Sequence, residues 1–69
     1  MIIYKDILGQ LKNSGYNTNR LRKEKLLSQS VMQAIRHDKP ITTKNIDVIC
    51  ELLNCQPNDI IEYKKRAPD

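Results

Sequence analysis

The sequence contains no tryptophan and no phenylalanine, and only two glycines and two cysteines among its 69 residues. A hydrophobic core must therefore be aliphatic, built from Ile, Leu, Val and Met. A glycine-rich phosphate-binding loop is excluded, because Gly9 and Gly15 are separated from one another. No apolar run approaches the roughly 18 residues of a membrane span. The first residues lack the charged start and long apolar run of a signal peptide.

Two cysteines are too few for a disulfide framework, so we expect a cytoplasmic protein with reduced thiols. A metal site is not expected either. Cys50, Cys55 and His37 fall short of the roughly four ligands of a zinc site, and Cys50 lies on an apolar stripe. No nucleophile and carboxylate are arranged around His37 in a catalytic motif. The sequence therefore predicts neither an enzyme nor a cofactor.

The length predicts one domain over residues 1–69, with one thin helical core and too little material for a deep catalytic cleft. The formal net charge is +4 and the pI about 9.3. Residues 1–44 carry nine basic and three acidic side chains, whereas residues 45–69 carry three basic and five acidic ones. This asymmetry favours a polyanionic partner for the basic part of the chain. The alternative is that the net charge of +4 reflects only ordinary charged side chains on a solvated surface.

Helical spacing of apolar residues predicts helices over about 5–14, 18–25 and 29–37, and a fourth from Thr42 or Thr43 to Leu53. A short fifth helix is expected to open at residues 56–59, with Pro57 in its first turn and Ile60 and Ile61 as buried anchors. Expected capping residues are Asn17 or Thr18, Ser28, and Thr42 or Thr43 at the starts, and Gly15 and Asn54 at the ends.

The two ends of the chain are rich in strand-favouring residues. The segments 2–5 and 61–64 can pair as a short two-stranded ribbon that ties the termini together. Residues 1–4 and 62–69 are accordingly assigned to terminal strand and tail segments, with residues 65–69 as a frayed tail.

Two short helices in succession, the second with polar outward side chains, form the geometry that enters a DNA major groove. We expect Met32 and Ile35 to hold the helix over 29–37 against the core. Its outward side chains are then suited to base edges, because Gln can pair with adenine and Arg with guanine. These base-contact candidates are Gln29, Ser30, Gln33 and Arg36.

Residues 18–59 resemble the lambda-repressor-like (Cro/repressor, or XRE-type) helix-turn-helix domain. The matching runs are LRKEKLLSQSVMQAI over 21–35 and IDVICELLNCQPNDIIEY over 46–63, the latter close to small bacterial and phage regulators. With the first helix, the resemblance covers nearly the whole chain. It implies an all-α, five-helix fold in which the second and third helices form the reading unit.

The resemblance places Thr18 at a usual phosphate contact, and His37 and Lys39 in a loop that approaches the DNA backbone. The basic run from Arg20 to Lys25 adjoins this pattern and favours phosphate contact over a merely solvated helix face. The phosphate-contact candidates are therefore Thr18, Arg20, Arg22, Lys23, Ser28, His37 and Lys39.

The chain departs from the family's pattern at three positions. Arg22 stands where a small residue is usual, Leu26 stands where the turn usually has glycine, and Asp38 replaces a frequent glycine after the third helix. The aliphatic part of the Arg22 side chain can pack along the surface while its guanidinium group stays exposed to solvent.

Taken together, these features predict a sequence-specific regulator of transcription, a repressor, which binds double-stranded DNA as a homodimer with the helix over 29–37 in the major groove. No small-molecule ligand is evident. The alternative is a protein-interaction adaptor or antitoxin-like module that reuses the fold. RNA binding is less favoured, because aromatic stacking residues are sparse.

Overall fold

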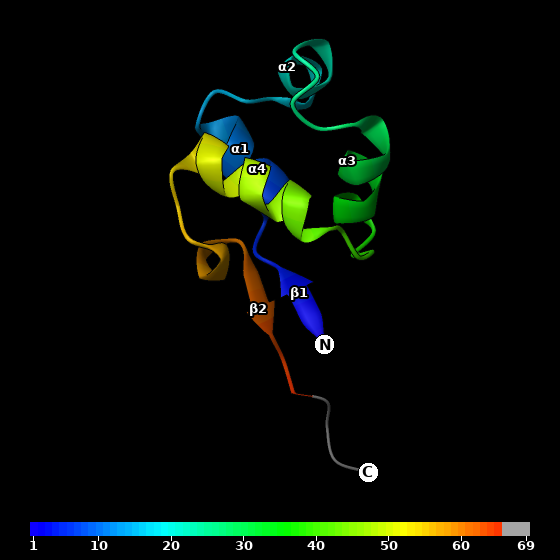
Figure 1. The fold of residues 1–69 in the computed structure, drawn as a ribbon, viewed down its shortest axis with the longest axis vertical. Coiled ribbons are helices and arrows are strands. Elements are labelled where there is room, and N and C mark those ends of the chain that lie inside the picture. Colours follow the sequence, from blue (N-terminus) through cyan, green and yellow to red (C-terminus); the bar gives the residue numbers. More distant parts are fainter. Residues whose placement is uncertain (66–69) are drawn as a thin grey trace.

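Four short α-helices and a terminal ribbon make up the structure, a computed structural model in which residues 1–65 are described (Figure 1). α4 packs against α1, α3 packs beside them, α2 lies at one end and the ribbon projects from the other. In chain order the elements are β1 (Ile2–Tyr4), α1 (Ile7–Asn13), α2 (Thr18–Lys23), α3 (Gln29–Arg36), α4 (Thr43–Leu53), the 3-10 turn η1 (Pro57–Asp59) and β2 (Ile61–Tyr63).

The buried side chains form one aliphatic cluster, as the composition predicts. Every helix contributes to it, and so do the turn before α3 and the end of η1. Its members are Ile7, Leu11, Leu21, Leu27, Met32, Ile35, Ile49 and Ile60. Because the helices have only 6 to 11 residues, they depend on this shared burial rather than on intrinsic helix stability.

The predicted N-caps of three helices are confirmed. The side chain of Asn17 accepts a hydrogen bond from the Arg20 backbone N–H at 2.8 Å, at the start of α2. Ser28 caps α3 through the Val31 N–H at 3.2 Å. Thr42 caps α4 in the same way. Each cap satisfies a backbone donor that the helix leaves free, typically worth about 1 kcal/mol.

The left-handed residue of the turn between α2 and α3 is Lys25, with φ of 55°, rather than Leu26. The Leu26 N–H bonds back to the carbonyl of Leu21 at 2.9 Å, and the Leu26 side chain packs on the core. A helix-ending turn of this type places the left-handed residue just before the one that returns to the core. α2 consequently ends at Lys23, two residues earlier than predicted.

The short fifth helix expected after Gln56 is a single 3-10 turn, η1, in the structure. The Asp59 side chain accepts a hydrogen bond from the Gln56 N–H at 3.0 Å and closes the turn. Ile60 is fully buried, as expected for an anchor, but Ile61 already belongs to β2. Strand pairing therefore ends the helical segment before an α-helical turn is complete.

The ribbon between the two ends is confirmed. β1 and β2 pair antiparallel with Ile2 opposite Tyr63, Ile3 opposite Glu62, and Tyr4 opposite Ile61. The expected tail over 65–69 lies outside the described residues, except for Lys65. None of the helices described between residues 1 and 65 is long and apolar enough to cross a membrane.

Lys25→Gly should stabilise the fold by roughly 0.5–1 kcal/mol, because glycine adopts a positive φ without the steric cost that a side chain incurs there. The matched control is Lys23→Gly, which removes the same charge from the last residue of α2 and should destabilise by up to about 1 kcal/mol. Urea unfolding followed by circular dichroism measures both. Equal destabilisation by the two variants would contradict the left-handed assignment at Lys25.

Candidate nucleic-acid interface

α3 is anchored by two buried side chains on its inner side. Met32 and Ile35 are 4 % and 6 % exposed and belong to the core. Since a helix turns by about 100° per residue, Gln33 projects on the side opposite Ile35. The residues of α3 that are exposed are the four predicted as base contacts, namely Gln29, Ser30, Gln33 and Arg36.

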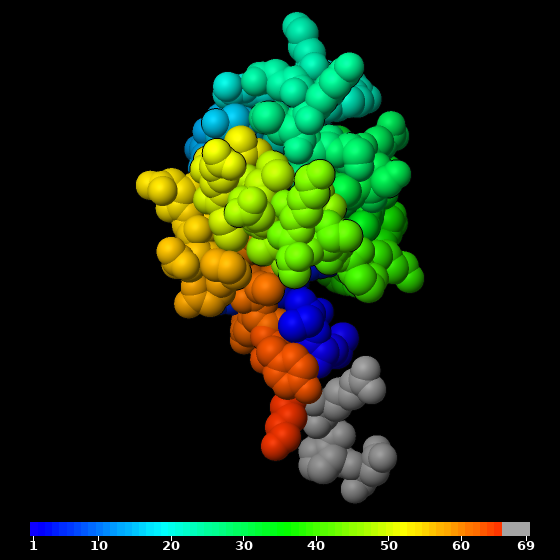
Figure 2. All heavy atoms as spheres, in the orientation of Figure 1, coloured from blue at the N-terminus to red at the C-terminus, as the bar shows by residue number. Residues whose placement is uncertain are grey.

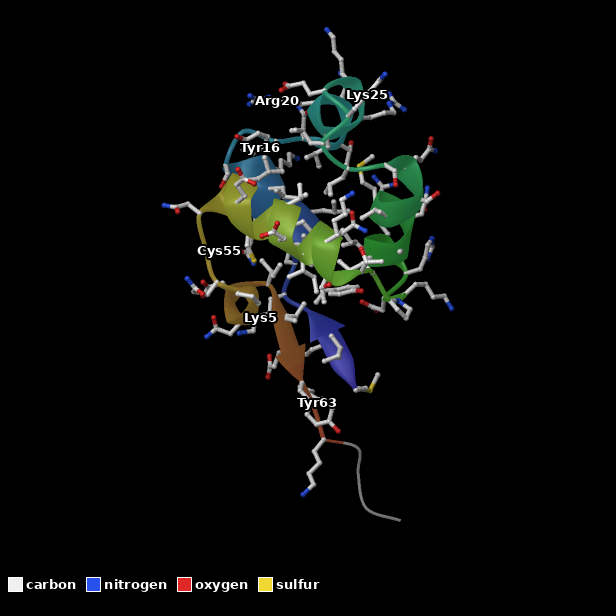
Figure 3. All side chains as sticks on the ribbon, viewed as in Figure 1. Lys5, Tyr16, Arg20, Lys25, Cys55 and Tyr63 are labelled. Carbon is white, nitrogen blue, oxygen red and sulfur yellow. The ribbon has the colours of Figure 1, made fainter. Side chains whose placement is uncertain are left out.

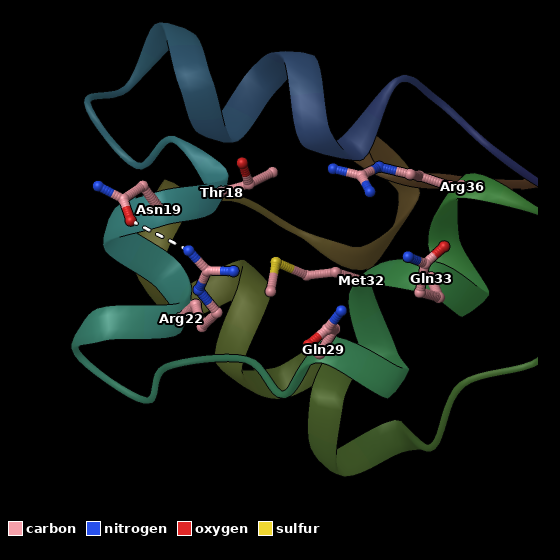
Figure 4. Close-up of a pocket in the computed structure, with 7 residues that line it drawn as sticks. All are labelled: Thr18, Asn19, Arg22, Gln29, Met32, Gln33 and Arg36. Carbon is pink, nitrogen blue, oxygen red and sulfur yellow. Dashed lines mark hydrogen bonds between the residues drawn. The ribbon is translucent and has the colours of Figure 1, made fainter.

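A polar cleft separates α2 from α3 (Figure 4). Its volume is about 120 Å³, well below the 300–1,000 Å³ of a typical small-molecule site. It therefore suits contact with the edge of a larger partner rather than enclosure of a ligand. We call it the α2–α3 cleft, and its lining is Thr18, Asn19, Arg22, Gln29, Met32, Gln33 and Arg36.

The α2–α3 cleft is cationic and rich in hydrogen-bond donors. Figure 4 shows Arg22 and Arg36 approaching it from opposite walls, with Met32 between them. No acidic residue lines it, so the two guanidinium charges are not neutralised inside the cleft. The Arg22 guanidinium donates a hydrogen bond to the Asn19 side-chain oxygen at 3.4 Å, which orients it along the helix. This arrangement favours a partner with negative charge and exposed acceptors.

The family model of the Cro/C1-type HTH DNA-binding domain matches residues 7–66 of the chain. The chain belongs to this family. The match spans the helix-turn-helix unit of α2 and α3, with α1 and α4 around it. No curated protein and no solved structure gave a significant match.

Within this HTH domain, five of the predicted site residues meet at one place. Three of the base-contact candidates and two of the phosphate-contact candidates line the α2–α3 cleft: Gln29, Gln33, Arg36, Thr18 and Arg22. Asn19 lies there too and was not predicted. Helical spacing could have predicted Asn19 as a site residue, because it stands three residues before Arg22 and therefore lies on the same face of α2.

Ser30 lies apart from the other base-contact candidates. It lines a neighbouring hollow between α3 and the start of α4, together with Ala34, Thr42 and Asn45. Ser30 is exposed at the surface of the HTH domain. Ser30 therefore flanks the α2–α3 cleft from the α4 side rather than contributing to it.

Arg20 is turned away from the α2–α3 cleft and bound within the domain (Figure 3). Its Nε bonds to the Glu24 carboxylate at 2.6 Å, and its Nη1 donates to the Gly15 carbonyl at 3.1 Å. The guanidinium also lies 4.5 Å from the centroid of the Tyr16 ring. The bond to Glu24 raises the pKa of Arg20, so the group stays charged, but its charge already has a partner.

The other phosphate-contact candidates lie around the ends of α2 and α3. Lys23 is exposed at the end of α2, and the Ser28 hydroxyl is used as the cap of α3. His37 and Lys39 are exposed in the turn after α3. The Lys39 N–H bonds to the Ala34 carbonyl at 2.7 Å, which fixes this turn to the helix.

Tyr4 links the ribbon to the turn after α3, because its hydroxyl donates a hydrogen bond to the Lys39 carbonyl. Partial burial raises the pKa of Tyr4, and the charge of Asp38 raises it further. Asp38 itself adopts the left-handed conformation, with φ of 55°, at the position where the family often has glycine. The position of this turn thus depends on contacts to β1 as well as on α3.

The two cysteines are free and half-buried, and burial raises the pKa of the Cys50 thiol. In the described part of the chain no group of three or more His, Cys, Asp or Glu side chains is placed to hold a metal ion.

Tyr4→Phe should destabilise the domain by roughly 0.5–1.5 kcal/mol at neutral pH, because it removes the hydrogen bond from the Tyr4 hydroxyl to the Lys39 carbonyl. The raised pKa of Tyr4 means that the folded state favours the neutral phenol. This contribution is complete below the unfolded pKa of about 10 and is lost as pH rises through the folded value. Unfolding free energies measured by urea titration between pH 7 and about 11 should therefore fall less steeply for Tyr4→Phe than for wild type. A slope for Tyr4→Phe equal to that of wild type would contradict this role.

Proposed function

We propose that this HTH domain is a sequence-specific regulator of transcription that represses by occupying its operator, with α3 in the major groove. The observation that carries the proposal is the convergence of Gln29, Gln33 and Arg36 with Thr18 and Arg22 on one acid-free surface. An α-helix with its side chains is about 10–12 Å across, and the major groove is about 12 Å wide. Residues 1–69 act as one domain in this proposal.

The contacts divide by chemistry. Gln29 and Gln33 carry amides that can pair with adenine, and Arg36 can make a bidentate pair with guanine. Thr18 and Arg22 contact phosphates from the α2 side, Lys23 contributes at the end of α2, and His37 and Lys39 contribute beyond the end of α3. Ser30 serves as a further contact on the α4 flank. Arg20 and Ser28 act within the domain, as partners of Glu24 and of the α3 backbone.

A single domain of this size makes few base contacts, so we propose that it binds a two-fold operator as a homodimer. The test is selection of genomic fragments by the purified protein at about 150 mM salt, close to physiological ionic strength. A shared inverted repeat among the bound fragments is the expected result. Binding without any enriched sequence would overturn the proposal.

Gln33→Ala should relax sequence preference at one base pair of each half-site, at a cost of about 1–3 kcal/mol. Gln33 is exposed on α3, so this truncation should leave the fold intact. Competition binding with operators substituted at each position measures the effect. Lys23→Ala is the control, and it should weaken binding to all sequences alike. If Gln33→Ala left the preferred sequence unchanged, α3 would not read bases through this side.

Arg22→Ala should lower affinity for every sequence and reduce the slope of log affinity against log salt by about 0.9, the contribution of one phosphate. Arg22→Lys should keep most of the slope, because a phosphate accepts either cation. Arg20→Ala is the matched control, since it removes the same charge from α2 but from a side chain bound to Glu24. Its salt slope should stay at the wild-type value.

Two results would contradict these assignments. A loss of slope for Arg20→Ala equal to that for Arg22→Ala would place the DNA elsewhere on α2. A loss of preference at a single guanine for Arg22→Lys would make Arg22 a base contact, because lysine cannot reproduce the bidentate geometry of arginine.

A further inference from the structure

The two cysteines of the chain come together at the end of α4. Cys50 lies in the last turn of the helix, and Cys55 is the second residue beyond it. Both side chains are half-buried. Figure 3 places Cys55 between the end of α4 and η1. Neither cysteine lines the α2–α3 cleft, so the pair forms a separate feature that does not depend on the proposed function.

The turn that ends α4 is what brings the two residues together. In a continuous helix, residues five positions apart point about 140° away from each other. Here Asn54 is left-handed, with φ of 52°, and reverses the chain. The Asn54 N–H bonds to the Glu51 carbonyl at 3.3 Å, and the Cys55 N–H bonds to the Cys50 carbonyl at 3.0 Å. This pair of hydrogen bonds is the Schellman motif, in which the side chains of the two outer residues frequently contact each other.

The geometry of the pair meets the requirements of a disulfide. Such a bond needs Cα atoms about 4.4–6.8 Å apart and side chains directed towards one another. The hydrogen bond of 3.0 Å between the two backbones, with standard bond lengths, limits the Cα–Cα separation to less than about 7 Å. Both side chains also line the same hollow. Burial raises the pKa of the Cys50 thiol, and the neighbouring Cys55 thiol raises it further.

Small molecules can reach the pair from solvent. The hollow that Cys50 and Cys55 line has a volume of about 490 Å³, within the range of sites that admit small ligands. Figure 2 shows the end of α4 and the segment after it, in yellow and orange, at the surface of the domain. An oxidant of small size can therefore meet the sulfur atoms without unfolding the protein.

A metal ion fits this place less well than a covalent bond does. A zinc site takes about four ligands. Among residues 1–65 no group of three or more His, Cys, Asp or Glu side chains is placed to hold a metal ion. Two adjacent thiols without further ligands are suited to oxidation instead, and disulfides of this kind are redox-sensing rather than structural in reducing compartments.

We propose that Cys50 and Cys55 form a reversible dithiol–disulfide site that fastens the end of α4 when the protein meets a small-molecule disulfide. The Cys55 thiol loses its proton, and its sulfur attacks one sulfur of the oxidant. One half of the oxidant leaves as a thiolate and takes up that proton, while the other half stays on Cys55 as a mixed disulfide.

The second step closes the bond within the chain. Cys50 acts second, because its raised pKa keeps it protonated. Its thiol loses the proton, its sulfur attacks the Cys55 sulfur, and the remaining half of the oxidant leaves as a thiolate that takes up the proton. Two electrons have then passed from the two cysteine sulfurs to the oxidant, which ends as two thiols.

The bond would hold the turn through which α4 leads into the ribbon. Pro57 and Ile61 line the same hollow as the cysteines, and the fully buried Ile60 lies between them in the chain. The native turn holds the two thiols together and so favours the disulfide. By linkage, the disulfide favours the native turn by the same factor. The oxidised protein should therefore resist unfolding more than the reduced protein.

The test is the disulfide equilibrium of the full chain in buffers of oxidised and reduced glutathione, measured for the folded chain and for the chain in urea. Alkylation of free thiols and intact-mass spectrometry distinguish the products, since the internal disulfide is two hydrogen atoms lighter and takes no alkyl group. We expect this product, with an equilibrium constant at least about tenfold larger for the folded chain. Equal constants overturn the proposal, as does a mixed disulfide or a disulfide between two chains as the end product.

Thermal unfolding is a second readout. Wild type oxidised by glutathione disulfide should melt at least about 5 °C above the reduced protein, and reduction by dithiothreitol should restore the lower value. Cys55→Ser is the matched control, because it keeps Cys50 and replaces sulfur by oxygen, and the oxidant should not raise its melting temperature. A rise for Cys55→Ser equal to that for wild type overturns the proposal, and so does an oxidised wild type that melts no higher than the reduced one.

Discussion

One backbone turn, repeated at the end of all four helices, determines how this short chain folds. In each case the residue that directly follows the left-handed residue donates its N–H to the carbonyl five positions earlier in the chain. The pairs are Tyr16 with Leu11, Leu26 with Leu21, Lys39 with Ala34, and Cys55 with Cys50. The turn stops the helix and returns the chain to the core. Because these helices are too short to persist alone, the points where they stop decide which faces meet.

The starts of α2, α3 and α4 were predictable from the sequence, whereas the start of α1 at Ile7 and the left-handed residues after α2 and α3 were not. Side-chain caps have a residue signature, and Asn17 and Ser28 carry it. The ends of α1 and α4 also have one, since Gly15 and Asn54 tolerate a positive φ. Lys25 and Asp38 occupy the same conformation without a strong residue signal. Their position follows from which neighbour reaches the core, and that depends on tertiary packing.

Tertiary packing also decides which of the candidate DNA-contact side chains are available at the surface. The period of 3.6 residues predicts which residues of α3 point outward, because Met32 and Ile35 identify the inner side. It does not distinguish Arg20 from Arg22, which stand two residues apart on a basic stretch and project in nearly opposite directions. Glu24 and Tyr16 bind one of them, and the neighbouring helix leaves the other in the cleft. Charge density along the sequence therefore overstates the number of cations free for phosphate.

The separation of cationic and apolar surfaces has an energetic consequence for assembly. Each copy carries a formal charge of +4, so two copies repel one another at low salt. Arg22 and Arg36 lie at the α2–α3 cleft, so the proposed homodimer would keep this repulsion small by pairing at a surface without lysine or arginine, such as the hollow lined by Ile41, Ile46 and Ile61. Phosphates that neutralise these arginines remove part of the remaining cost. In the homodimer proposed above, DNA binding and the pairing of two copies would then favour each other by linkage, since each stabilises the state that the other requires.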